Sequence, residues 1–131
     1  NFNEAPLKAT LYGYEICFST KTRDWKSAMI DIREKKDGKV EGVLYDVSDD
    51  TIVIFDDHEK VSGGKHSRIN VFVKTSACLS VPAYTYISPV KDGNFYPSPE
   101  YIELIIEGAQ FNKLSRDYID FINSFYPVKK N

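Results

Sequence analysis

The first two thirds of the chain alternate apolar and polar residues with the two-residue period that is typical of β-strands. Five segments show this pattern, at residues 7–18, 28–33, 40–47, 69–73 and 81–87. Gly13 interrupts the first segment, and a glycine inside a strand predicts a kink or a bulge there. Asp37-Gly38 lies between the second and third segments and favours a tight turn, so we expect these two segments to form a hairpin.

The last third changes to the period of amphipathic helices. Ser98 followed by Pro99 indicates an N-cap and a first helical residue. The stripe expected to face the core consists of Tyr101, Leu104, Ile105, Gly108 and Ala109. A second helix is predicted from about Leu114-Ser115 to a point before Pro127, with an apolar face of Tyr118, Phe121, Ile122 and Phe125. Strands followed by helices predict an α+β fold.

Residues 48–57 are compatible with two structures. Ser48 is a good N-cap, and the acidic residues after it would lie in a first turn, which favours a helix. The apolar residues 52–55, however, have the composition of a strand. The pattern alone leaves both structures open.

Length and composition are those of an ordinary globular domain. The 131 residues and 15.0 kDa correspond to a single domain, which we expect to cover residues 1–131. With 42% hydrophobic and 27% charged residues, intrinsic disorder is excluded. The formal net charge of −2 gives no indication of a nucleic-acid or membrane partner, and no heptad pattern indicates a protein partner. No apolar segment approaches the roughly 18 residues of a membrane span, so we expect a cytoplasmic protein.

The two cysteines show no metal-ligand spacing. Cys17 and Cys78 are far apart in the sequence and lie beside apolar residues. We therefore expect two reduced, buried thiols and no metal site.

The densest cluster of chemically active side chains follows residue 55. Asp56, Asp57, His58 and Glu59 bring together three carboxylates and an imidazole. A carboxylate that transfers protons has to be partly desolvated, and the apolar residues 52–55 could form the necessary wall. The alternative is a solvated loop whose charges only face water.

Tyrosines form the second candidate cluster. Tyr84 and Tyr86 share one face of a predicted strand, and Tyr101 opens the next helix and could meet them. Tyr96 lies between these segments. Such a cluster is either part of the core or the lining of a pocket whose hydroxyl groups contact a ligand.

The order of these features resembles the γ-glutamylcyclotransferase-like family. Residues 9–14 (Ala-Thr-Leu-Tyr-Gly-Tyr) are similar to the family's A-x-L-x-G-Y strand, and residues 41–47 (Glu-Gly-Val-Leu-Tyr-Asp-Val) to its G-V-V-Y strand. Residues 55–59 (Phe-Asp-Asp-His-Glu) are similar to its L-D-x-x-E motif. Further matches follow in the same order at residues 83–86, 97–101 and 105–109, Leu114 and Tyr118.

This resemblance implies a small mixed or antiparallel β-barrel with flanking helices, two of them C-terminal. It implies an enzyme that cyclises a small-molecule γ-glutamyl amine to 5-oxoproline, without a metal or organic cofactor. Glu59 would be the catalytic acid and base, and Tyr86 and Tyr101 would line the substrate pocket. Residues 48–57 would form a short helix that leads to Glu59.

Two departures accompany the resemblance. The family has a Tyr-Gly-Ser-Asn loop after its first strand, and the sequence contains no such loop. We therefore expect that this first strand is missing here, that the domain is incomplete at its N-terminus and that the natural chain continues upstream. His66 stands where the family often has an aromatic residue, and either hydrogen-bonds substrate or caps the loop.

Two other classes of protein are compatible with the sequence. A non-catalytic binding or interaction domain could retain the fold and Glu59 without the anion-binding loop. An unrelated α+β domain would instead have a strand at residues 48–57 and a fully exposed Glu59.

Overall fold

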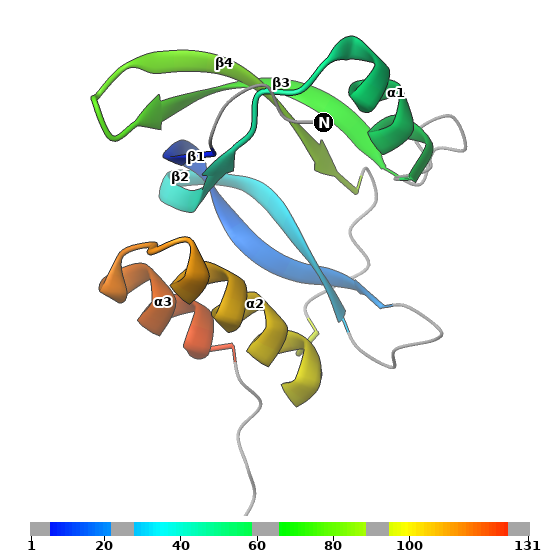
Figure 1. Ribbon diagram of the computed structural model, residues 1–131. Coiled ribbons are helices and arrows are strands. Elements are labelled where there is room, and N and C mark those ends of the chain that lie inside the picture. The colour runs from blue at the N-terminus through cyan, green and yellow to red at the C-terminus, as the bar shows by residue number, and fades with distance from the viewer. Residues whose placement is uncertain (1–5, 22–27, 59–65, 89–94, 126–131) are drawn as a thin grey trace, which may run out of the picture.

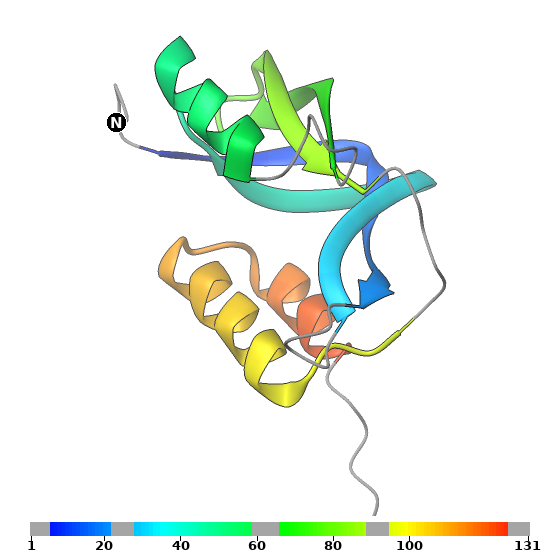
Figure 2. The same ribbon diagram turned by 90° about the vertical axis from the view of Figure 1, so that its right-hand side faces the viewer.

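A computed structural model describes residues 6–21, 28–58, 66–88 and 95–125 of the chain (Figure 1). The elements are β1 (Leu7–Lys21), β2 (Ala28–Leu44), α1 (Asp49–His58), β3 (Ser67–Thr75), β4 (Ser80–Ile87), α2 (Pro99–Phe111) and α3 (Arg116–Asn123). Figures 1 and 2 show β3, β4 and α1 on one side of the long β1–β2 pair, and α2 with α3 on the other. Within the described residues, no helix is long and apolar enough to span a membrane.

The four strands form one antiparallel sheet in the order β2-β1-β3-β4. The predicted α+β class is therefore confirmed. The sheet of the described strands is open rather than a closed barrel, because β2 and β4 are its two edges and form no ladder with each other. The joint between its halves is short, since β1 pairs with β3 only at Ala9↔Thr75 and Thr10↔Lys74.

The strand irregularity predicted at Gly13 is present, although the extra residues of the bulge lie on β2, where residues 35–38 oppose Gly13 alone. The register with β2 shifts between Tyr12 and Tyr14, and Gly13 has a φ of +87°, which glycine adopts without the steric penalty of a side chain. Figure 2 shows how strongly β2 bends along its length. Because of this bend, the end of the pair that contains the start of β1 joins β3, while the end that contains the start of β2 faces the C-terminal helices.

The predicted hairpin around Asp37-Gly38 is wrong. Residues 28–33 and 40–44 belong to one strand, β2, and both parts pair with β1 instead of with each other. Tyr14 pairs with Glu34 and Tyr12 with Lys39, so the residues between them form a bulge. Asp37 has a φ of +65° in this bulge, which is the left-handed conformation that the Asp-Gly pair indicated. The local turn signal was sound, but pairing with a third segment decided the topology.

Helix α1 settles the structure of the ambiguous segment. The hydroxyl oxygen of Ser48 accepts a hydrogen bond from the backbone N–H of Thr51 at 3.2 Å, as expected of an N-cap. Residues 49–58 are helical, which confirms the helix and overturns the strand expected for an unrelated α+β domain.

The main core lies between β1 and the two C-terminal helices. Its buried residues are Ile16, Phe18, Ile102, Ala109, Tyr118 and Ile122. Ser98 and Ser115 cap α2 and α3 as predicted, each accepting a hydrogen bond from the backbone N–H three residues later.

The predicted stripe of α2 was wrong at Leu104. This side chain is 55% exposed, whereas Ile102, which the stripe left out, has no exposed surface. Two residues turn a helix by about 200°, so these two side chains lie on nearly opposite sides. Ile102 and Ala109 are two turns apart and share the buried face.

The two thiols differ in burial. Both cysteines are free, and Cys17 is buried in β1 as expected. Cys78, however, is exposed in the β3–β4 turn, where it has a φ of +63°. The prediction of a buried Cys78 is wrong because the turn points its apolar neighbours away from any core.

Candidate active site

A cavity of about 780 Å³ lies between α1, the end of β2 and the β3–β4 pair. Its apolar lining includes Ile52 and Phe55 of α1, and its polar lining includes Asn70, Tyr84 and Tyr86 of the sheet. This mixture of apolar surface and a few polar groups is typical of a small-molecule site.

The apolar wall predicted from residues 52–55 is only half realised. Ile52 and Phe55 line the cavity, whereas Val53 and Ile54 are about two thirds exposed, at 66% and 65%. In a helix, residues three apart share a face, so the helical conformation sends two of the four side chains to the cavity and two to solvent.

Tyr86 joins this cavity to the last turn of α1. Its hydroxyl donates a 2.6 Å hydrogen bond to Oδ1 of Asp56, and both side chains are partly buried. Hydrogen bonds to a carboxylate are stronger than those between neutral groups. The contact therefore holds the C-terminal end of α1 against β4.

Arg68 completes this network from β3. It lies directly opposite Tyr86 in the sheet, and its Nη1 is 3.0 Å from Oδ2 of Asp56. The guanidinium carbon also lies 4.6 Å from the ring centroid of Tyr84, the diagonal neighbour, in a cation–π contact. Asp56 and both tyrosines stand out in the sequence, whereas no pattern along the chain identifies Arg68. Strand register places Arg68 opposite Tyr86, and the packing of α1 brings Asp56 to it.

The structure separates the tyrosines of the predicted cluster. Tyr84 and Tyr86 both line the cavity, whereas Tyr96 is exposed and Tyr101 is not among the lining residues. The hydroxyl of Tyr101 instead accepts a hydrogen bond from the backbone N–H of Ile30 at 3.1 Å. This bond attaches the first turn of α2 to β2. The role of Tyr101 in a substrate pocket stays a prediction.

Asp31 links the start of β2 to the end of β4. This buried carboxylate accepts hydrogen bonds at Oδ1 from the backbone N–H groups of Ile32 and Ser88, at 2.8 and 3.2 Å. Ser88 is two residues beyond Tyr86, so Asp31 fixes the strand end that carries the cavity tyrosine.

The two remaining predicted site residues flank the segment between α1 and β3. Glu59 comes directly after α1 and lies outside the described residues. His66 is half-buried immediately before β3 and is not among the residues that line the cavity. Their predicted roles in proton transfer and substrate binding therefore stay predictions. Within the described residues, no three His, Cys, Asp or Glu side chains come together as a metal-ligand group.

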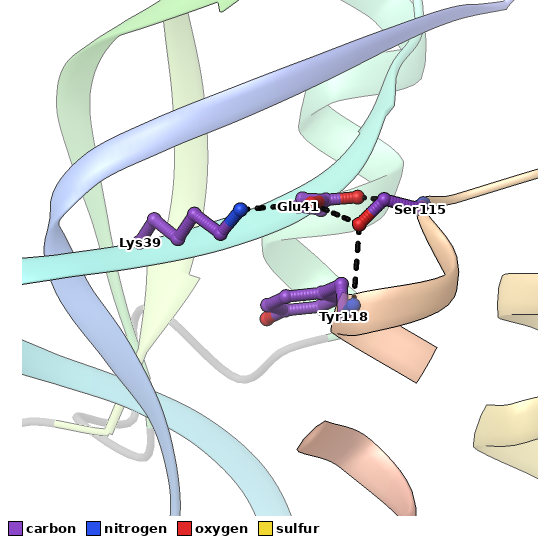
Figure 3. Close-up of polar contacts among 4 residues, drawn as sticks. All are labelled: Lys39, Glu41, Ser115 and Tyr118. Carbon is purple, nitrogen blue, oxygen red and sulfur yellow. Dashed lines mark hydrogen bonds and ion pairs between the residues drawn. The ribbon is translucent and has the colours of Figure 1, made fainter. Parts of the chain in front are cut away.

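A second polar cluster joins β2 to α3 (Figure 3). Oε1 of Glu41 accepts a 2.9 Å hydrogen bond from the backbone N–H of Ser115, and Oε2 accepts one of 2.6 Å from its hydroxyl. Lys39 Nζ lies 3.3 Å from the same Oε2. Burial by itself raises the pKa of Glu41, but these contacts together outweigh it and hold the pKa below its usual value.

Tyr118 lies beneath this cluster (Figure 3). Its hydroxyl is buried and makes no hydrogen bond of ordinary geometry among the described residues, and the backbone of Glu41 is the polar group that interacts with it. Burial is the main reason why the pKa of this phenol is raised. Neither Glu41 nor Tyr118 contributes to the larger cavity, so we assign this cluster to the attachment of α3.

Comparison with known proteins defines the family. The profile of the AIG2-like family matches residues 39–122, which is well over half of the chain. The chain therefore belongs to the AIG2-like family. No curated protein matches it in sequence.

Solved structures show the same fold. A γ-glutamyl cyclotransferase superimposes with a TM-score of 0.86 and 21% identity, over 95% of this chain and 76% of that one. An uncharacterized protein from Homo sapiens superimposes with a TM-score of 0.86 and 21% identity, over 98% of this chain and 80% of that one. YkqA from Bacillus subtilis superimposes with a TM-score of 0.82 and 23% identity, over 94% of this chain and 45% of that one. The resemblance to the γ-glutamylcyclotransferase-like family is thus confirmed, and at these identities the structural likeness concerns the fold.

Proposed function

We propose that the chain carries out a γ-glutamyl cyclotransferase reaction, in which a small-molecule γ-glutamyl amine is converted to 5-oxoproline and the free amine. The main support is the Tyr86–Asp56 hydrogen bond of 2.6 Å, which fixes the end of α1 at the wall of the 780 Å³ cavity. Glu59 follows that helix end by one residue. The fold, shared with a γ-glutamyl cyclotransferase, supports the same reaction class.

In the proposed mechanism, Glu59 is both base and acid. Its carboxylate accepts a proton from the α-ammonium of the substrate, and the freed amine attacks the γ-carbonyl carbon. A C–N bond of the five-membered lactam forms, and the bond to the leaving nitrogen breaks as Glu59 returns the first proton to that nitrogen. The ring nitrogen gives up its second proton in the same step, and this proton leaves on the released amine, which departs as an ammonium ion. Because the attack is intramolecular, a site that holds the glutamyl chain in a folded conformation supplies much of the rate.

The described residues around the cavity are suited to excluding water and to binding the polar groups of the substrate. Ile52 and Phe55 exclude water from one side, and exclusion of water strengthens electrostatic interactions inside the site. Asn70 and Thr85 offer an amide and a hydroxyl group that can hydrogen-bond a polar substrate. We assign Tyr86 a positioning role, because its hydroxyl already donates to Asp56.

The test is the release of 5-oxoproline from a panel of γ-glutamyl dipeptides and γ-glutamyl-lysine by the natural full-length chain. Glu59→Gln keeps the side-chain volume but cannot carry the proton, so we expect turnover to fall at least about 1000-fold, within the usual range for a general acid and base. Asp57→Asn is the matched control, since Asp57 is an exposed carboxylate near the end of the same helix.

Turnover that disappears in Glu59→Gln and persists in Asp57→Asn, with unchanged thermal unfolding of both, would establish the reaction and its acid–base residue. Absence of turnover on every member of the panel would instead favour a binding domain of the same fold. Equal loss in both variants would contradict the specific role of Glu59.

A further inference from the structure

A second cavity, of about 240 Å³, lies where the β1–β3 joint meets the turn between α2 and α3. It shares no lining residue with the larger cavity. Figures 1 and 2 show the α2–α3 turn facing the end of the sheet on the side away from α1. Its lining includes three lysines from three different elements: Lys8 of β1, Lys74 of β3 and Lys113 of the α2–α3 turn.

Strand register brings the sheet lysines together. Thr10 pairs with Glu41 of β2 on one side and with Lys74 of β3 on the other, so these three side chains form a row across the sheet. Directly opposed residues point to the same face, and so does Lys8, two residues before Thr10. Adjacent strands lie about 4.8 Å apart, so the two lysines are neighbours on this face.

The carboxylate in this lining, Glu41, already has partners outside the lysine group. Its two oxygens accept hydrogen bonds from Ser115 and contact Lys39, which is not part of the cavity (Figure 3). Within the part of the chain that the structure describes, no carboxylate is in ion-pair contact with Lys74 or Lys113. The cavity therefore carries an excess of positive charge, although the whole chain has a formal net charge of −2.

Lys113 holds its place at a conformational cost. It has a φ of +58° at the C-terminus of α2, where its N–H donates to the carbonyl of Gln110 and that of Leu114 donates to Ala109. Glycine is the favoured residue at this position of a helix end, because a side chain disfavours a positive φ. Lys8 Nζ donates to the carbonyl oxygen of Lys113 at 3.1 Å, so the two lysines are tied together.

We propose that this cavity binds a small phosphate-bearing anion through the ammonium groups of Lys8, Lys74 and Lys113. Lysine is a compact point charge that binds phosphate well, and two or three ammonium groups match a phosphate dianion better than they match a single carboxylate. The hydroxyl groups of Thr10 and Ser76 in the lining supply neutral donors. The bound anion would supply the negative charge that no carboxylate of the described residues provides to Lys74 and Lys113.

The experiment is an amide chemical-shift titration of the full natural chain with inorganic phosphate and with glycerol 3-phosphate, at constant ionic strength. We expect saturable shifts at residues 74–76 and 113–115. The double variant Lys74→Gln/Lys113→Gly should weaken binding at least about 10-fold, because it removes two of the three ammonium groups and each close charge pair near a protein surface strengthens binding several-fold. Lys35→Gln/Lys36→Gln removes the same charge from the exposed bulge of β2 and should leave the affinity unchanged.

Tighter binding of glycerol 3-phosphate would identify a phosphomonoester as the ligand, and equal binding would identify phosphate itself; both support the site. The proposal is overturned by shifts that do not saturate, by equal losses in the two double variants, or by acetate binding at the same residues with equal affinity. Lys74→Gln alone tests the site without any change at the helix end, and thermal unfolding checks that each variant is folded.

Discussion

The hydroxyl of Tyr86 donates a 2.6 Å hydrogen bond to Asp56, and this bond joins an edge strand to the helix that precedes Glu59. Thirty positions separate the two residues in the sequence. Asp56 also forms an ion pair with Arg68 of β3, so one carboxylate holds α1 against both strands of the β3–β4 pair. The geometry of the proposed active site therefore depends on a contact between side chains that do not themselves transfer the proton.

Tyr86→Phe removes this hydroxyl and keeps the ring. We expect the free energy of unfolding to fall by about 1 to 2 kcal/mol, because a hydrogen bond to a charged and partly buried group is lost. Urea denaturation measures the change. Tyr84→Phe is the matched control: it keeps the ring beneath Arg68 and should change stability by less than about 0.5 kcal/mol. Equal effects of the two variants would contradict the structural role of the Tyr86–Asp56 bond.

Glu41→Gln should give a stability difference that depends on pH. The pKa of Glu41 is lowered in the folded chain, so its charged form stabilises the fold above the unfolded pKa of about 4.3, and this contribution is lost as pH falls through the folded pKa. We expect the wild-type chain to be more stable than the variant by about 1 kcal/mol at pH 7. The difference should shrink progressively below about pH 4.

Unfolding curves at a series of pH values measure this difference. Glu34→Gln serves as the control, because Glu34 is an exposed carboxylate of the same strand. A Glu41→Gln difference that is constant from neutral to acidic pH would show that Ser115 and Lys39 do not favour the charged carboxylate.

Tyr118→Phe removes a buried hydroxyl that makes no hydrogen bond of ordinary geometry among the described residues. Removing a polar group that is not hydrogen-bonded relieves its desolvation penalty, so we expect stability to stay equal or to rise by up to about 1 kcal/mol. Tyr101→Phe provides the contrast, since it deletes the acceptor of the Ile30 N–H and should lower stability by about 1 kcal/mol. Thermal unfolding of both variants measures these stability changes. A clear loss of stability in Tyr118→Phe would contradict the prediction, because it would show that the hydroxyl has a hydrogen-bond partner.

Gly38→Ala should disrupt the bulge of β2. A Cβ atom at this position would lie 2.6 Å from the backbone oxygen of Tyr14, and a backbone atom cannot move aside as a flexible side chain can. We expect a loss of about 2 kcal/mol or more, which is typical of overpacking. Gly42→Ala, four residues further along the same strand, meets nothing within 4 Å and should be nearly neutral. Chemical denaturation of the pair tests the close approach of β1 to β2.

The local pattern of the sequence determined the two C-terminal helices and the strand character of the segments that form the sheet. Ser98-Pro99 and Ser115 mark helix starts because a serine side chain satisfies backbone N–H groups within its own turn. Gly13 marked the irregularity of β1 because a positive φ favours the residue without a side chain. The order of motifs along the chain also identified the family, since the AIG2-like match covers the region in which several of them lie.

Which elements meet depends on contacts that form only in the folded chain. Asp37-Gly38 has the chemistry of a hairpin turn, yet both flanking segments pair with β1, because a bulge and a turn need the same left-handed backbone. Helix α1 remained undecided in the sequence because its N-cap and its apolar residues favour different structures. The Arg68–Asp56 pair and the three lysines of the smaller cavity come from distant segments. Strand register places Lys8, Lys74 and Arg68, and the packing of α1 and of the α2–α3 turn against the sheet brings Asp56 and Lys113 to them. Contacts of this kind depend on pairing between segments, which no local pattern encodes.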